Sequence, residues 1–162
     1  MAADIQRLLP HRGAALFLDE AEVFGSSARG SACWRGEHPH LQGHFPGQPV
    51  VPGVYLLEAA AQLAGVAALA GDEAASQGRT GVLAAVRRSL FHRLVRPGER
   101  VHYTLDVRTV SQGAMVQASG SASVAEHKVL TVEHTVALVA ASALQPINGA
   151  KAPLQHGMQG VA

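Results

Sequence analysis

Residues 43–70 read GHFPGQPVVPGVYLLEAAAQLAGVAALA, and the second part of this stretch predicts the central element of the fold. From about Gly53 to Ala70 nearly every position is Ala, Leu or Val. Pro52 stands where a helix begins and its missing N–H is not needed, and Gly71 ends the run. Because the apolar residues cover all sides of this helix, the rest of a soluble fold must wrap around it.

The second half of the chain predicts a sheet. Apolar and polar residues alternate over residues 101–108, 116–123 and 130–138. This period-2 patterning is typical of antiparallel strands joined by short turns. Residues 14–35 also look extended. One buried helix together with a long antiparallel sheet predicts an α+β fold in which the sheet curls around the helix.

Length and composition narrow the class of protein. A chain of 162 residues is the size of one domain, which we expect over residues 1–140, with a flexible tail over 141–162 where the patterning stops. The chain carries 13 Lys plus Arg and 12 Asp plus Glu, a balance that argues against a nucleic-acid-binding protein. The single cysteine, Cys33, excludes an internal disulfide framework and is expected to be a small buried hydrophobe.

Location can also be predicted from apolar segments. The first residues lack the apolar region of an export signal. The apolar stretch 54–70 is short for a membrane span and is interrupted by Glu58 and Gln62. We therefore expect a cytoplasmic protein with no membrane segment.

A candidate site combines the predicted helix with the loop that precedes it. Residues 36–53 are dense in Gly and Pro, which is typical of a long, shaped and functional loop. His44 lies in this loop, and Glu58 lies about one and a half turns into the apolar helix, where a carboxylate needs a partner or must keep its proton. Together they offer a base and an acid. Gln62 shares a helical face with Glu58 and is expected to orient it.

The start of the helix adds a further feature. The N–H groups of Gly53 and Val54 have no partner within the helix. Such a terminus stabilises negative charge and is able to polarise a carbonyl group.

Several segments together resemble the 3-hydroxyacyl-acyl-carrier-protein dehydratases of bacterial fatty-acid synthesis. In chain order, the matching segments are Leu9-Pro10-His11-Arg12, Gly43-His44-Phe45-Pro46-Gly47, Pro52-Gly53-Val54, Glu58-Ala59-Ala60-Ala61-Gln62 and Phe91-His92-Arg93-Leu94-Val95-Arg96-Pro97-Gly98-Glu99. The resemblance implies the hot-dog fold, a sheet wrapped around a long central helix.

The resemblance also implies roles for individual residues. His44 would remove the C2 proton of a 3-hydroxyacyl thioester, and Glu58 would protonate the departing 3-hydroxyl. The Gly53 N–H would donate to the thioester carbonyl, with Val54, Gln62 and Phe45 binding substrate. The product is a trans-2-enoyl thioester, in fatty-acid or related polyketide or polyene biosynthesis. No metal or cofactor is implied.

Other interpretations remain open at this point. The protein is alternatively a hot-dog protein that binds acyl thioesters without catalysis, or a thioesterase that uses Glu58 with water. His38, His40 and His44 have a spacing that can bind zinc or iron, which would indicate a metal-dependent enzyme. His134 interrupts an apolar strand face and is expected to be a hydrogen-bonded core histidine.

The resemblance and the charge pattern point to partners. Arg87, Arg88, Arg93 and Arg96 form either a solvated edge or a docking surface for an acidic acyl carrier protein. The family resemblance implies a homodimer or a hexamer built from three dimers, with each site sharing His44 and Glu58 between subunits. The open edges of a curled sheet favour such pairing.

Overall fold

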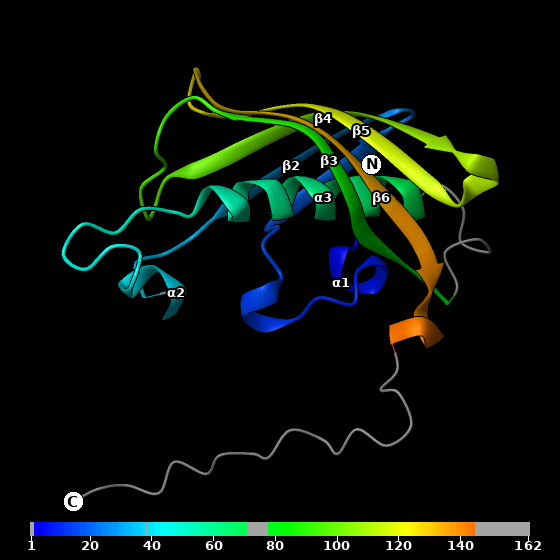
Figure 1. The fold of residues 1–162 in the computed structure, drawn as a ribbon, viewed down its shortest axis with the longest axis horizontal. Coiled ribbons are helices and arrows are strands. Elements are labelled where there is room, and N and C mark those ends of the chain that lie inside the picture. The colour runs from blue at the N-terminus through cyan, green and yellow to red at the C-terminus, as the bar shows by residue number, and fades with distance from the viewer. Residues whose placement is uncertain (1, 38, 71–77, 145–162) are drawn as a thin grey trace, which may run out of the picture.

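The computed structural model describes residues 2–37, 39–70 and 78–144, in which six antiparallel strands curl around one long helix (Figure 1). The sheet has the order β1-β2-β4-β5-β6-β3. Its strands are β1 (Glu20–Phe24), β2 (Ser27–Cys33), β3 (Arg79–Phe91), β4 (Arg100–Val110), β5 (Met115–Val124) and β6 (His127–Ala140). The helices are α1 (Ile5–Leu8), α2 (Pro39–Gln42) and α3 (Gly53–Ala70). Single 3-10 turns occur at Gly13–Ala15, Ser111–Gly113 and Ala141–Leu144. The predicted α+β arrangement is confirmed.

Helix α3 has the bounds that the sequence predicts and lies across the inner face of the sheet (Figure 1). It packs against all six strands. Leu56, Leu63 and Val66 are almost completely buried between helix and sheet. By length and composition α3 is apolar enough to cross a membrane, and more than half of it is buried inside the protein, as in the core helix of a soluble domain.

Strands β4, β5 and β6 correspond to the three predicted alternating segments. Tyr103 pairs with Ala122, which in turn pairs with Leu130, and all three face the helix in the core. Gly120 stands at an inward position of β5 because a Cβ there would collide with the Thr104 carbonyl oxygen of β4. The period-2 pattern therefore sets which face of each strand is buried.

One part of the fold differs from the expectation, and one strand was not predicted. The expected extended segment 14–35 is broken into a 3-10 turn and the β1–β2 hairpin, which turns at Gly25, whose φ is +57°. Strand β3 has no clean alternation in its sequence. Its register shifts between Leu83 and Ala85 and between Val86 and Arg88, and each shift moves the next side chains to the other face.

The expected domain boundary is only partly covered by the structure. Residues 141–144 form a 3-10 turn that directly follows β6. The remainder of the proposed tail, residues 145–162, lies outside the described residues.

Among the residues that the structure describes, one histidine lies in the core, His134 of β6, which is 1% exposed. Its burial is as expected, but the expected hydrogen bond is absent, since neither ring nitrogen has a partner among the described residues. Burial lowers the pKa of His134 from 6.5 to about 4. Cys33 is half-buried rather than fully buried.

The buried His134 predicts acid sensitivity of the fold. Between pH 6.5 and pH 4 the unfolded chain binds a proton at His134 and the native chain does not, so stability falls as the pH falls. A pKa shift of this size corresponds to about 3 kcal/mol. We expect urea unfolding of His134→Leu to lack this part of the pH dependence. The exposed His102→Gln is the control, and parallel pH curves for wild type and His134→Leu would contradict the prediction.

Candidate active site

The carboxyl group of Glu58 is held by two side chains. Its Oε1 accepts a hydrogen bond from Gln62 Nε2 at 3.0 Å and lies 3.5 Å from His11 Nε2. The Glu58 side chain is 35% exposed in the single chain, so it is less buried than its apolar helix suggests. Both partners contact the same oxygen, which leaves Oε2 available to a substrate.

Gln62 is itself fixed by the segment that follows α1. Its Nε2 donates to the Ala15 carbonyl at 2.8 Å, and its Oε1 accepts from the Phe17 N–H at 3.0 Å. The Gln62 side chain is 2% exposed, so burial and three hydrogen bonds hold it in one orientation. This amide connects the N-terminal segment to Glu58.

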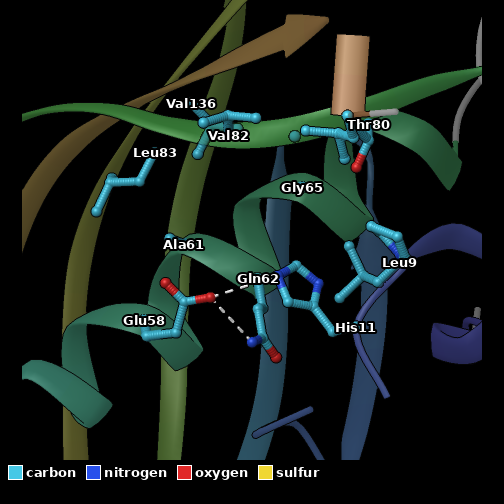
Figure 2. Close-up of a pocket in the computed structure, with 13 residues that line it drawn as sticks. Leu9, His11, Glu58, Ala61, Gln62, Gly65, Thr80, Val82, Leu83 and Val136 are labelled. Atoms are coloured by element: carbon cyan, nitrogen blue, oxygen red, sulfur yellow. Dashed lines mark hydrogen bonds and ion pairs between the residues drawn. The ribbon is translucent and has the colours of Figure 1, made fainter. Parts of the chain in front are cut away.

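His11 is the member of the site that the sequence reasoning missed. Its place in a matched segment indicated a family signature but no contact. The Leu9-Pro10-His11 segment passes α3 and brings the imidazole to Glu58 (Figure 2). His11 Nδ1 is buried and has no hydrogen-bond partner among the described residues. The signal available in the sequence was the Leu-Pro-His-Arg motif itself.

A cavity of about 300 Å³ begins at Glu58 and runs between α3 and β3 (Figure 2). Most of its wall is apolar. The lining residues are Leu9, Pro10, His11, Glu58, Ala61, Gln62, Gly65, Thr80, Gly81, Val82, Leu83, Val136 and Leu144. A carboxyl group in the wall of a mostly apolar cavity can act on a reacting group of an apolar ligand bound there.

His44 is half-buried in the loop between α2 and α3. Its Nδ1 lies 2.9 Å from the Val50 carbonyl oxygen, and its ring stacks on Phe45 with centroids 4.2 Å apart. A carbonyl oxygen only accepts, so this contact requires the proton on Nδ1. In the neutral ring Nε2 is then the basic nitrogen.

The single chain does not bring His44 and Glu58 together. His44 is not among the residues that line the Glu58 cavity, and no hydrogen bond or ion pair joins the two within the described part of the chain. Phe45 is 57% exposed and Val54 64% exposed. The loop and the start of α3 therefore present their side chains outward.

Gly53, at the start of α3, lies against the ring of Phe91 at the end of β3. A Cβ at Gly53 would be 3.0–3.2 Å from three ring atoms, so the ring would have to move by a few tenths of an ångström. A glycine at this position thus lets an aromatic ring sit beside the first N–H groups of the helix.

We expect Gly53→Ala to lower kcat/KM for the dehydration that the family resemblance implies by about tenfold, without unfolding the protein. The added methyl displaces Phe91 at the helix start, and small misplacements near a reacting group are costly. Adding Phe91→Leu should recover part of the loss. Gly36→Ala is the matched control because nothing lies within 4 Å of a Cβ there. Wild-type kinetics in Gly53→Ala would show that the fit against Phe91 is unimportant.

The three-histidine interpretation gains no support. His38 lies outside the described residues, and the side chain of His40 is not described. Among the described residues, no group of three His, Cys, Asp or Glu side chains is placed to hold a metal ion.

Two of the four arginines at residues 87, 88, 93 and 96, here called the arginine cluster, form ion pairs. Arg87 lies 3.0 Å from Glu133, and Arg93 lies 3.0 Å from Glu99. The hydrogen bond from Arg93 is the main cause that lowers the pKa of Glu99. These contacts reduce the net positive charge of the cluster, so its surface is a mixture of both signs.

A curled antiparallel sheet wrapped around one central helix, with a cavity beside that helix that contains the Glu58 carboxyl group, defines a protein of the hot-dog fold. The family model of the FabA-like domain matches residues 10–133, and the chain belongs to this family.

Two relatives named as dehydratases match most of this chain. The 3-hydroxyacyl-[acyl-carrier-protein] dehydratase FabZ of Caldanaerobacter subterraneus subsp. tengcongensis is 36% identical over 133 residues, covering 80% of this chain and 92% of that protein. FabZ of Clostridioides difficile is 36% identical over 139 residues, which cover 84% of this chain and 95% of that protein.

Solved structures show the same fold at lower identity. The dehydratase heterocomplex ApeI:P from Xenorhabdus doucetiae matches with a TM-score of 0.71 and 14% identity, covering 85% of this chain and 92% of that one. The conserved protein PA5202 from Pseudomonas aeruginosa matches with a TM-score of 0.61 and 17% identity, and the match covers 83% of this chain and 98% of that one. At these identities the match concerns the fold alone.

Proposed function

We propose that this protein dehydrates 3-hydroxyacyl thioesters carried on acyl carrier protein to trans-2-enoyl thioesters. The observation that carries the proposal is the Glu58 carboxyl group, held by Gln62 and His11 at the head of an apolar cavity. Membership of the FabA-like family and the FabZ relatives support the same reaction.

The reaction can be written with the residues of this chain. His44 Nε2 removes the C2 proton, and the electron pair of the broken C–H bond forms the C2=C3 double bond. The C3–O bond breaks as Glu58 delivers its proton to the leaving hydroxyl, which departs as water. The Gly53 N–H at the helix start stabilises the charge that builds up on the thioester oxygen. Proton exchange with solvent returns both groups to their starting states.

This mechanism needs two subunits, because one chain does not join His44 to Glu58. Strand β3 is an edge of the sheet, and it exposes Val82, Val86 and Leu90 by 41–42% each. An apolar edge strand is a ready surface for pairing with another chain. We propose a homodimer through β3, in which each site takes His44 from one subunit and Glu58 from the other, and a trimer of dimers as the larger assembly.

The carrier protein is proposed to dock beside β3. In the single chain Arg88 and Arg96 are exposed, and neither takes part in an ion pair within the described part of the chain. Their charges suit the acidic surface of an acyl carrier protein. We place the reaction in the cytoplasm and in fatty-acid synthesis, with a related polyketide or polyene route as the specialised form of the same chemistry.

One assay separates the competing activities. The protein is incubated with a 3-hydroxyacyl thioester while ultraviolet absorbance follows the conjugated enoyl product and a thiol reagent follows free thiol. Dehydration raises the first signal only, and a thioesterase raises the second only. A binding protein without catalysis changes neither, and that result would refute the proposed function.

A further inference from the structure

His11 lies in the wall of the Glu58 cavity and contacts the carboxyl group directly. Its Nε2 is 3.5 Å from Glu58 Oε1, the oxygen that also accepts the Gln62 hydrogen bond at 3.0 Å. Figure 2 shows both contacts reaching this one oxygen, while the second oxygen of Glu58 points away from them. The two neighbours therefore act on one oxygen of the acid and leave the other to the substrate.

The position of His11 is fixed by the residues on either side of it. Leu9 is 3% exposed and packs against α3, where a Cβ added at Gly65 would lie 3.4 Å from Leu9 Cδ2. The Arg12 guanidinium donates to the Leu9 and His11 carbonyl oxygens at 2.6 and 2.7 Å. It also donates to the Gln6 carbonyl oxygen at 2.8 Å. Because a guanidinium presents its donors in a rigid fork, the imidazole is held in place before substrate arrives.

The surroundings of the His11 ring indicate which nitrogen carries the proton. Nδ1 is buried and has no partner among the described residues. A proton on Nδ1 would leave a buried N–H without an acceptor, whereas a proton on Nε2 faces an oxygen of Glu58 that accepts. The geometry therefore favours the neutral ring with its proton on Nε2. In this form His11 donates to Glu58 and is not a second base.

The charge on Glu58 changes during the proposed reaction. Glu58 begins as a carboxylic acid, and it becomes a carboxylate when its proton moves to the leaving hydroxyl. Hydrogen bonds to a charged oxygen are roughly twice as strong as those to a neutral one. Catalytic hydrogen bonds are often long in the free enzyme and shorten in the transition state, which fits the distance of 3.5 Å. A donor at Oε1 therefore stabilises the transition state more than the bound substrate.

We propose that His11 is a positioning residue of the dehydration: it donates from Nε2 to Glu58 Oε1, keeps the acidic proton on Oε2, and stabilises the carboxylate that forms as water leaves. The inference rests on the proposed dehydratase function and adds a residue to its mechanism. Because the hydrogen bond strengthens only after substrate has bound, its loss should lower kcat and leave KM nearly unchanged.

The first test measures kcat and KM for enoyl formation from a 3-hydroxyacyl pantetheine thioester. We expect His11→Ala to lower kcat about ten- to hundredfold, the effect of losing one hydrogen bond to a charged group. His11→Gln places an amide N–H at a similar reach and should recover most of this loss. His102→Ala, at an exposed position of β4, is the matched control. An equal loss in His11→Gln and His11→Ala, or a rise in KM alone, would overturn the inference.

A double variant shows whether His11 acts through Glu58. His11→Ala is combined with Glu58→Gln, and the residual rate is compared with that of Glu58→Gln alone. No charge develops at residue 58 in this background, so we expect no further loss in kcat. A purely structural role would lower kcat by the same factor in both backgrounds, which would contradict the proposal. If His11→Ala does not fold, His11→Leu takes its place.

A measurement without turnover separates this inference from the proposed function. Nitrogen NMR of histidine-labelled protein distinguishes the two neutral ring forms, and His11→Gln identifies the His11 signals by their loss. We expect the proton on Nε2, and a changed Nε2 signal in Glu58→Gln. If the wild-type protein does not dehydrate the thioester, the proposed function fails and the NMR result still decides the contact. A proton on Nδ1, or an Nε2 signal unaffected by Glu58→Gln, would overturn the inference.

Discussion

His44→Ala and Glu58→Gln should each lower the dehydration rate about 10²- to 10⁴-fold, the usual cost of removing a general base or a general acid. Alanine leaves no group to accept the C2 proton. Glutamine keeps the shape and the contacts of Glu58 with Gln62 but has no proton to give to the leaving hydroxyl. The measurement is the initial rate of enoyl formation at saturating substrate.

Controls for this result come from residues of the same type at exposed positions. His102→Ala on β4 and Glu126→Gln in the turn between β5 and β6 should keep full activity. Circular dichroism should show the same fold in all four variants. Near-wild-type turnover in either site variant, with an unchanged spectrum, would remove that residue from the mechanism.

Mixing the two inactive variants should restore about a quarter of wild-type activity. If each site combines His44 of one subunit with Glu58 of the other, a mixed dimer has one site with both substitutions and one with neither. Random pairing makes half of the dimers mixed, and half of their sites are intact. The experiment co-expresses His44→Ala and Glu58→Gln chains with different tags and assays the unfractionated pool, where a quarter is expected, and then the mixed dimer purified through both tags, where about half is expected.

The controls for this experiment are dimers of each variant purified in the same way. They should remain inactive, which shows that the restored rate comes from the mixed species. A verified mixed dimer that stays inactive would show that each site is built within one chain. That result would contradict the shared-site model while leaving the dehydration chemistry open to the single-variant assay.

Periodicity made some elements predictable. Helix α3 is predicted from about Gly53 to Ala70 because its apolar residues and its terminal signals lie within one continuous segment. Strands β4, β5 and β6 follow from strict alternation, since a strand buried on one face repeats every two residues. Their burial confirms that one local pattern decided both the element and the face.

Strand β3 was beyond this kind of reasoning. Its two register shifts break the alternation, and several of its apolar side chains, including Val86 and Leu90, are exposed in the single chain. A strand at the edge of a sheet can have apolar residues that face a second surface as well as apolar residues that face its own core. The sequence of one segment does not show where the second surface lies.

The sequence by itself determined the central helix, the strand periodicity and the residue types available as acid and base, because each is encoded within a short segment. The tertiary structure alone decided which distant segments meet. It brought His11 to Glu58 and kept His44 apart from Glu58. Such contacts depend on strand register and on how the N-terminal segment packs against α3. The periodicity of a short segment predicts neither of these.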